Sequence, residues 1–225
     1  MNQKTWIVIA AYNEGSVIRE VVKSVLEVWE NIVVIDDGST DNTGPEAFAA
    51  GAIVVTHPIN LGQGAALATG ILYSLENGAD YIVTFDADGQ HHVEDIQRLV
   101  NSAQSHNVDI VIGSRFLGTT RDMPTRRRLV LKAAVLFTRL TTGLKVTDAH
   151  NGLRCISKDA ARKITINQNR MAHASEILEK VAQHKLKIKE EPVTITYTEY
   201  SLNKGQKLSN SINILLELLL GRVHK

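Results

Sequence analysis

Short apolar runs rich in valine and isoleucine alternate with segments of helical periodicity through the first 112 residues of the chain. Strands that are apolar on both faces need cover on both faces, and a helix between two such strands lets them pair in parallel. We expect strands at residues 5–10, 31–35, 52–56, 80–85 and 109–112, and helices at residues 16–29, 45–50, 65–76 and 93–103. The pattern predicts an α/β fold with a Rossmann-like, mostly parallel sheet and helices on both faces.

The alternation stops after about residue 115. A basic segment at residues 121–128 precedes an expected helix at 129–140, and a loop at 147–154 is followed by an expected helix at 175–184. Residues 192–197 alternate with period two, as a half-buried strand does, and an apolar-rich helix is expected at 208–220. With 225 residues, one domain with a C-terminal helical elaboration is the simplest account.

The net charge of +1 conceals a strong asymmetry between the two halves. Residues 1–96 hold three Lys/Arg and 14 Asp/Glu, whereas residues 97–225 hold 22 Lys/Arg and ten Asp/Glu. An acidic half is suited to a metal ion, and a basic half to phosphates, nucleic acid or an anionic membrane; a chance difference between exposed faces is the alternative. The single cysteine, Cys155, excludes a disulfide framework, and no stretch approaches the ~20 apolar residues of a membrane span.

Two carboxylates, Asp86 and Asp88, follow the strand expected at residues 80–85, where parallel sheets bind their ligands. In an extended chain these side chains point the same way and repel each other unless a cation lies between them. A hard divalent ion with oxygen ligands suits the pair, and Gln90 offers a further carbonyl oxygen. The alternative is that Asp88 caps the helix beginning near Val93.

Polar residues also follow the second and third expected strands. Asp36 and Asp37 lie where a carboxylate can accept hydrogen bonds from a base or a ribose hydroxyl, with an Asx turn around Asp41 as the alternative. The loop with Gly62 and Gly64 lacks the third glycine of the dinucleotide fingerprint. Its two glycines still allow a nucleotide or phosphate to approach the backbone closely.

Five motifs occur in order along the chain: Ala11-Tyr-Asn-Glu14, Val34-Ile-Asp-Asp-Gly-Ser-Thr-Asp41, Asn60-Leu-Gly-Gln-Gly64, Phe85-Asp-Ala-Asp-Gly-Gln-His91 and Gly113-Ser-Arg115. This series resembles family 2 glycosyltransferases with the GT-A fold. Within that family the chain is most similar to the dolichyl-phosphate mannose synthase-like group, which charges polyprenyl phosphates. Arg126-Arg-Arg128 before an apolar helix and the segment from Asp148 to Arg154 also resemble that group, so the likeness covers about residues 5–195.

The resemblance implies a role for each matching residue. The expected nucleotide-sugar pocket contains Ala11, Tyr12, Glu14, Asp36, Asp37, Gly64, Asp86, Ala87 and Lys207. The aspartate-x-aspartate motif would hold Mg²⁺ or Mn²⁺ on the donor diphosphate, with Asp86, Asp88 and Gln90 as ligands. The expected acceptor-phosphate contacts are Arg115, Arg126, Arg127 and Arg128. The chain departs from the group at Ser201. Members of the group often carry an arginine at this position, about six residues before the lysine that Lys207 matches, and Tyr200 and Lys204 are the candidate substitutes here.

The chemistry follows from the charges involved. A nucleoside diphosphate leaves readily once its charge is neutralised, and attack from the opposite face inverts the anomeric centre. A hydroxyl acceptor needs a general base, whereas the oxygens of a lipid phosphate are already anionic. The base candidates in the second half are Asp148 and His150, although a surface or capping role is the preferred interpretation of His57, His150 and His173. The expected catalytic residues are Asp88, Arg115 and Asp148.

The excess of Lys and Arg in the second half of the chain suggests several binding partners. Arg126, Arg127, Arg128 and Lys132 would attract an acceptor phosphate or anionic headgroups, with a solvated helix end as the alternative. The helix at 208–220 can dock on its own domain, pair with another subunit or lie in a membrane interface, so homo-oligomerisation stays open. Nucleic acid is not expected, because the sequence carries no groove-reading motif.

Together these observations predict a metal-dependent inverting glycosyltransferase that moves a sugar from a UDP- or GDP-sugar to a polyprenyl phosphate. We expect it to be cytoplasmic and peripheral on the cytoplasmic face of a membrane. The expected domain spans residues 1–200, with a nucleotide and metal half (1–115) and an acceptor half (116–200), before a mobile segment and apolar helix (201–225). The alternatives are the same fold acting on a saccharide hydroxyl and a non-catalytic module that binds a nucleotide-sugar or Mg²⁺.

Overall fold

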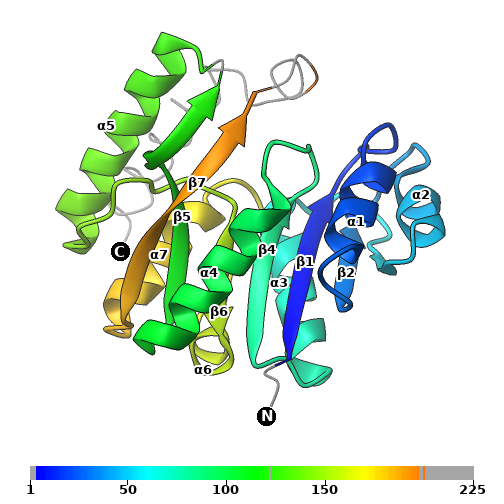
Figure 1. The fold of residues 1–225 in the computed structure, drawn as a ribbon, viewed down its shortest axis with the longest axis horizontal. Coiled ribbons are helices and arrows are strands. Elements are labelled where there is room, and N and C mark those ends of the chain that lie inside the picture. The colour runs from blue at the N-terminus through cyan, green and yellow to red at the C-terminus, as the bar shows by residue number, and fades with distance from the viewer. Residues whose placement is uncertain (1–3, 122, 198–199, 201–225) are drawn as a thin grey trace.

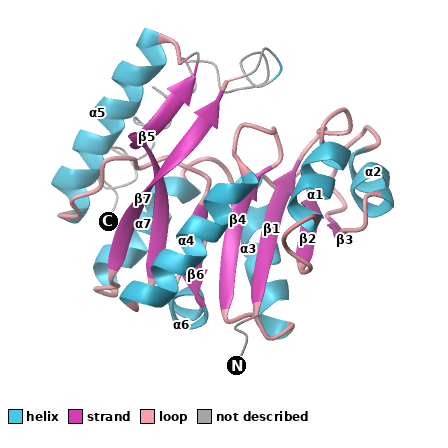
Figure 2. Ribbon diagram, in the orientation of Figure 1, coloured by secondary structure: helices cyan, strands magenta, loops and turns pink. Residues whose placement is uncertain are grey.

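A single seven-stranded sheet lies between two layers of helices in the computed structural model, which describes residues 4–121, 123–197 and 200 (Figures 1 and 2). The strands are β1 (Thr5–Ala11), β2 (Ile32–Asp36), β3 (Ile53–Thr56), β4 (Tyr81–Asp86), β5 (Ile110–Arg121), β6 (Arg154–Ser157) and β7 (Ile188–Thr196). The helices are α1 (Ile18–Leu26), α2 (Thr43–Ala49), α3 (Gln63–Glu76), α4 (Val93–His106), α5 (Thr125–Thr142), α6 (Lys158–Lys163) and α7 (His173–Gln183).

The strand order is β3-β2-β1-β4-β6-β5-β7. β1 pairs in parallel with β2 and β4, β2 with β3, and β5 with β7, whereas β6 runs antiparallel to both of its neighbours. The predicted mostly parallel α/β sheet is therefore confirmed. The chain moves outward from β1 to β3 and then returns to place β4 on the other side of β1, so the strand order reverses between β1 and β4. Ligands of such sheets bind at this reversal, beyond the carboxyl ends of the strands.

The two faces of the sheet are covered by different helices. Alternate residues of β1 point to opposite faces, so Ile7 and Ile9 pack with α1, α2 and α4, while Trp6 and Val8 pack with α3, α6 and α7. Figure 1 shows α1 and α4 in front of the sheet and α3, α6 and α7 behind it. This double cover explains why the strands of the first half are apolar on both faces.

The second half differs from the expectation in three places. β5 and β7 are longer than expected and pair with each other past a register shift between Ser114 and Thr119. The short strand β6 and the helix α6 were not expected, because β6 begins with Arg154, whose charge interrupts the apolar pattern. The helix α5 begins at Thr125, so Arg126, Arg127 and Arg128 lie in its first turn and do not precede it.

Two further expectations concern the organisation of the chain. The expected boundary between residues 115 and 116 falls inside β5, so both expected halves contribute strands to one sheet. The apolar helix expected at 208–220 and Lys207 lie outside the described residues. Within residues 4–121, 123–197 and 200, no helix combines the length and the apolar character that a membrane crossing requires.

Candidate active site

The predicted carboxylate pair lies at the point where the strand order reverses. Asp86 is the last residue of β4, and its Cα pairs in register with that of Ala10 in β1, next to the end of β2. The chain turns immediately after Asp86, so Asp88 does not lie in an extended segment as the sequence argument assumed. Instead, the Oδ1 atom of Asp88 accepts a hydrogen bond from the Gln90 backbone N–H (3.0 Å), and its Oδ2 atom accepts one from Gln90 Nε2 (2.6 Å).

The two carboxylates differ in their electrostatic surroundings. Burial raises the pKa of Asp86, but the hydrogen bond and charge of His91 and the charges of Arg154 and Arg115 lower it, and the net shift is downward. Burial and the nearby charge of Asp86 together raise the pKa of Asp88 to about 6. The two acids are therefore close enough to repel each other, which is the situation that a divalent cation relieves.

The donor set fits a magnesium or manganese ion that is shared with a substrate. Among the residues that the structure describes, no group of three or more His, Cys, Asp or Glu side chains is placed to hold a metal. Two carboxylates would then be the protein's main contribution, and Mg²⁺ bound in this way would take its other ligands from substrate phosphates and water. Gln90 turns its amide nitrogen toward Asp88, so its part as a ligand stays a prediction. The alternative that Asp88 caps α4 is wrong, because the N-cap of that helix is His92.

Sequence analysis missed the residues that hold Asp86 in place. The Nε2 atom of His91 lies 3.0 Å from Asp86 Oδ2, and the His91 ring packs against Phe85. On the other side, a Cβ atom on Gly152 would lie 2.2 Å from Asp86 Oδ2, so the carboxylate lies tightly against this glycine. His91 was visible in the same motif as Asp86, but the contact with Gly152 joins residues 66 positions apart and leaves no local signal.

Arg154 is a further residue that the sequence did not single out. It is buried in β6 opposite Thr84, and its Nη2 atom donates a long hydrogen bond (3.5 Å) to the Ala149 carbonyl. Its Nε atom has no hydrogen-bond partner within the described part of the chain. Burial lowers the pKa of Arg154 to about 10, while the charges of Asp86 and Asp148 raise it. Arg154 is therefore a cation at neutral pH and stabilises the ionised form of Asp86.

The carboxylates at the end of β2 accept hydrogen bonds from other groups of the protein. Asp37 is buried, and its oxygens accept hydrogen bonds from the N–H groups of Leu61 (3.0 Å) and Gly62 (2.7 Å) and from Asn60 Nδ2 (3.0 Å). Asp37 therefore holds the loop at residues 57–62. The predicted contact of Asp37 with a base or ribose stays a prediction, because these hydrogen bonds occupy much of its acceptor capacity.

Two neighbours of Asp37 complete this region. Asp36 accepts a hydrogen bond from the Ser39 N–H (3.1 Å) and lies against Gly44 at the start of α2, so its predicted nucleotide contact also stays a prediction. His57 is buried and bridges Asp37 Oδ1 (2.8 Å) and Thr69 Oγ1 (3.0 Å). The expected surface or capping role of His57 is therefore wrong.

The loop after β1 connects to the start of the C-terminal segment. The Ala11 carbonyl accepts a hydrogen bond from the Asp37 N–H (2.8 Å) and joins the ends of β1 and β2, while the Tyr12 side chain is exposed there. Ala87 is buried in the core next to the carboxylate pair. The carboxylate of Glu14 accepts a hydrogen bond from the Tyr200 hydroxyl (2.6 Å), so Tyr200 reaches the predicted nucleotide pocket; Lys204 and Lys207 lie outside the described residues.

The glycines before α3 face the protein's own chain. A Cβ atom on Gly64 would lie 2.0 Å from the Gln168 carbonyl oxygen, and one on Gly62 would lie 2.3 Å from that of Asn169. The Ala65 N–H donates to the same Asn169 carbonyl (3.2 Å). Residues 168–169 therefore occupy the space that a side chain at these glycines would need, and the predicted approach of a nucleotide phosphate to Gly64 stays a prediction.

The substitution Gly64→Ala tests the packing of residues 168–169 against this glycine. Helix propensity alone predicts that alanine stabilises α3 by up to ~1 kcal/mol. Overlap with the Gln168 carbonyl predicts instead a loss of about 1–3 kcal/mol, because a backbone atom has to move. We expect the free energy of unfolding in urea to fall, and an unchanged or higher value would show that residues 168–169 do not restrict this position.

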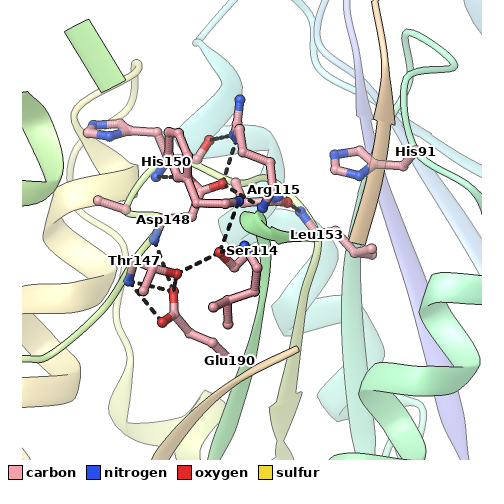
Figure 3. A network of polar contacts seen from close by, with 12 residues as sticks. His91, Ser114, Arg115, Thr147, Asp148, His150, Leu153 and Glu190 are labelled. Atoms are coloured by element: carbon pink, nitrogen blue, oxygen red, sulfur yellow. Dashed lines mark hydrogen bonds and ion pairs between the residues drawn. The ribbon is translucent and has the colours of Figure 1, made fainter. Parts of the chain in front are cut away.

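Arg115 and Asp148 form a buried ion pair in the second half of the sheet (Figure 3). Asp148 Oδ2 accepts hydrogen bonds from Arg115 Nε (2.5 Å) and from the Arg115 N–H (3.1 Å). The remaining guanidinium nitrogens of Arg115 donate to the Tyr197 hydroxyl (3.0 Å) and the His150 carbonyl (3.1 Å). Three separate segments therefore meet at this arginine: β5, the loop with Asp148 and His150, and the residue that follows β7.

The network continues to β7. Glu190 Oε1 accepts hydrogen bonds from the N–H of Asp148 (2.9 Å) and the hydroxyl of Thr147 (3.0 Å), and Thr147 contacts Ser114 Oγ (2.6 Å), as Figure 3 shows. Burial raises the pKa of Glu190, and the hydrogen bonds from Asp148 and Thr147 lower it in part. Sequence analysis missed Glu190 because its partners lie more than 40 positions away.

These contacts change the interpretation of the expected catalytic groups. A general-base role does not fit Asp148, because its side chain is fully buried and paired with Arg115. The predicted phosphate contact of Arg115 stays a prediction, since all its described bonds are to protein groups. Burial lowers the pKa of His150 and of His173 to about 4, so both rings are neutral at pH 7. His173 is buried and contacts the Arg170 carbonyl, which corrects its expected surface or capping role.

The basic residues of α5 line a groove beside this network. Arg126 and Arg128 are exposed, whereas the Arg127 guanidinium lies over the Tyr197 ring, 5.0 Å from its centroid. The groove has a volume of about 350 Å³ and is lined by Phe116, Arg128, Lys132, Val135, Leu136, Arg139 and Thr147. It therefore combines three cations with an apolar wall, next to the loop that Asp148 anchors.

Comparison with known proteins agrees with this geometry. The model of glycosyl transferase family 2 matches residues 6–165. An uncharacterized protein of Methanocaldococcus jannaschii is 38% identical over 97% of this chain and 92% of its own length. A Methanococcus voltae protein, UDP-N-acetylglucosamine--dolichyl-phosphate N-acetylglucosaminyltransferase, is 32% identical over 98% of this chain and 96% of its own length.

A solved structure shares the fold. The crystal structure of glucosyl-3-phosphoglycerate synthase from Mycobacterium tuberculosis, in complex with Mn²⁺ and UDP-glucose, superposes with a TM-score of 0.76. The match covers 97% of this chain and 77% of that chain at 19% identity, so it shows a fold of the GT-A type. The predicted fold and the predicted enzyme class are thus both confirmed. The match of the family model to residues 6–165 and the full-length relatives show that this chain belongs to glycosyltransferase family 2.

Proposed function

We propose that this enzyme transfers a sugar from a nucleotide-sugar donor to a polyprenyl phosphate, with inversion and with Mg²⁺ or Mn²⁺. The observation that carries the proposal is the pair Asp86 and Asp88 at the point where the strand order reverses. The crystal structure from Mycobacterium tuberculosis has Mn²⁺ and UDP-glucose bound, and the Methanococcus voltae relative is named for transfer to dolichyl phosphate. Both properties support the same assignment for this chain.

The donor half would bind the nucleotide diphosphate at the ends of β1, β2 and β4. Asp86 and Asp88 would hold the metal, His91 fixes the orientation of Asp86, and Gln90 fixes that of Asp88. When bound, the ion neutralises charge that the leaving nucleoside diphosphate develops. Tyr12 and Glu14 lie on the loop after β1, where they would contact the nucleotide. The proposed diphosphate contact of Lys207 concerns a residue outside the described part of the chain.

The acceptor half supplies cations and offers no free base among the described candidates. Asp148 is paired with Arg115, and His150 is neutral and buried at its Nδ1 atom. An anionic phosphate oxygen attacks the anomeric carbon without giving up a proton, so this arrangement suits a lipid phosphate better than a sugar hydroxyl. The new carbon–oxygen bond forms as the bond to the nucleoside diphosphate breaks on the opposite face, which inverts the centre.

This assignment gives the donor and metal to the acidic first part of the chain and the acceptor phosphate to the basic second part. Residues 1–115 would bind donor and metal, and residues 116–200 the acceptor phosphate through Arg126 and Arg128, whereas the expected segment at residues 201–225 lies outside the described residues. We propose that the enzyme works as a peripheral protein on the cytoplasmic face of a membrane. Membership of a glycosyltransferase family argues against the alternative of a non-catalytic binding module.

Product analysis tests the proposal. The purified protein is incubated with Mn²⁺ or Mg²⁺, a panel of UDP- and GDP-sugars, and a short polyprenyl phosphate. We expect one labelled sugar to move into the lipid fraction and transfer to stop when the metal is chelated. Donor hydrolysis or transfer to an added saccharide, with no lipid product, would overturn the assigned acceptor and favour a saccharide hydroxyl.

A further inference from the structure

The helix α5 has two faces of opposite exposure. Its inner face buries Ala134, Val135 and Thr138 against the domain. Its outer face presents three leucines that are 65% (Leu129), 59% (Leu136) and 78% (Leu140) exposed. Residues seven and four positions apart fall on one side of a helix, so these leucines form a single stripe along the solvent face. Figure 1 shows α5 at the outer edge of the molecule, with its outer side away from the sheet.

Exposed cations flank the leucine stripe. Arg126, Arg128, Lys132 and Arg139 are exposed on the same helix, which carries no acidic residue. Residues 116–146 contain seven Lys/Arg and one acidic residue, Asp122, so the excess of positive charge extends beyond α5. Leu136 also lines the cationic groove, which places the groove directly beside the stripe.

We propose that the outer face of α5 docks on an anionic lipid surface and lies in the plane of the interface. Interfacial helices combine an apolar stripe, which enters the boundary between headgroups and acyl chains, with Lys and Arg at the level of the headgroups. Leu129, Leu136 and Leu140 would enter this boundary over a length of ~16 Å. Nucleic acid would pair with the cations and leave the leucines in water, and protein–protein interfaces tend to exclude charged residues from their centre.

Docking in this way would let the groove bind the phosphate of an acceptor that stays in the membrane. This part of the inference rests on the proposed function. The groove opens beside the stripe, so its three cations would lie near the headgroup level, where the phosphate of a membrane-bound polyprenol is found. The isoprenoid chain would then stay in the lipid while its phosphate enters the groove. The enzyme would need no spanning segment to reach such an acceptor.

Vesicle binding of the full-length protein tests the docking surface. Co-sedimentation is measured without donor, on vesicles of phosphatidylcholine with or without phosphatidylglycerol, at low and high salt. The test variant L129S/L140S changes two leucines that do not line the groove. The matched control, F48S/L72S, changes two side chains on α2 and α3 that are 73% and 57% exposed. All four positions are exposed, so thermal unfolding should stay close to that of the wild type.

We expect the wild type to bind the phosphatidylglycerol vesicles, to bind them more weakly at high salt, and to bind phosphatidylcholine poorly. The variant L129S/L140S should lose affinity by at least about tenfold, and the control should not. Equal binding of L129S/L140S and wild type would overturn the proposal and place any membrane affinity elsewhere, residues 201–225 included. A wild-type dimer that this variant converts to a monomer, with vesicle binding unchanged, would make the stripe a subunit interface instead.

The docking surface and the proposed function fail in different ways. Vesicle binding that depends on the leucines, without sugar transfer to polyprenyl phosphate, would refute the acceptor and leave the docking surface in place. Transfer to a short, soluble polyprenyl phosphate by a protein that binds no vesicles would refute the docking surface and leave the function in place.

Discussion

Replacing Asp88 with asparagine is expected to reduce the turnover of sugar transfer by at least about 100-fold, because one of the two carboxylates proposed to hold the metal on the donor diphosphate loses its charge. Asparagine keeps the size of the side chain, and its carbonyl oxygen still accepts the hydrogen bond from the Gln90 N–H that aspartate accepts now. The fold should therefore survive, and the loss should appear in kcat at saturating donor and metal. The concentration of Mn²⁺ that gives half-maximal activity should rise as well.

The control for this variant is Asp159→Asn. Asp159 is exposed in the first turn of α6 and takes no part in the site, so the same change of charge should leave kcat unaltered. Full activity in Asp88→Asn would refute the metal role of the pair. Equal losses in both variants would show that a general change of charge, and not this carboxylate, limits the reaction.

Replacing Asp148 with asparagine should lower the free energy of unfolding by about 3–5 kcal/mol, since it leaves the Arg115 guanidinium buried without a counter-charge. For a chain of this length the melting temperature should fall by roughly 10 °C. The loss would be measured by urea and thermal unfolding, independently of any substrate.

A double variant separates loss of the charge pair from loss of packing. Replacing both partners with apolar side chains, as in R115M/D148L, removes the unpaired charge and should recover much of the lost stability. A double variant that is less stable than Asp148→Asn would show that the hydrogen bonds to Tyr197 and His150, rather than the ion pair, hold these segments together.

The sequence predicted the first half of the fold well because its signals are local. β1, β2 and β4 are buried on both faces, so each appears as a continuous apolar run, and the half-buried edge strand β3 is apolar as well. The helices between these strands show one apolar side. β6 could not be found in the same way, because Arg154 is buried there through its surroundings in three dimensions and not through any periodicity. The extension of β5 past Ser114 depends on its pairing with β7, about 75 residues later.

The candidate site shows the same division between local and distant information. The position of Asp86 and Asp88 followed from the end of a strand, although a turn, and not an extended chain, brings the two together. The roles predicted for Asp37, Gly64 and Asp148 came from their motifs. In the structure Asp37 contacts the loop at 57–62, Gly64 lies against residues 168–169, and Asp148 pairs with Arg115. Residue types therefore indicated where the chemistry lies, and long-range contacts decide which of these groups face a ligand.

The placement of β6 between β4 and β5 has a consequence for how the protein is made. Within the described residues β5 pairs with β6 and β7 alone, so the strand at residues 110–121 has no partner strand until residues 154–157 have left the ribosome. The first four strands can already assemble at that stage, with β4 as an open edge that carries the unpaired backbone groups of residues 81–84. Synthesis of the first four strands thus produces an exposed strand edge, and the arrival of the four residues of β6 closes it.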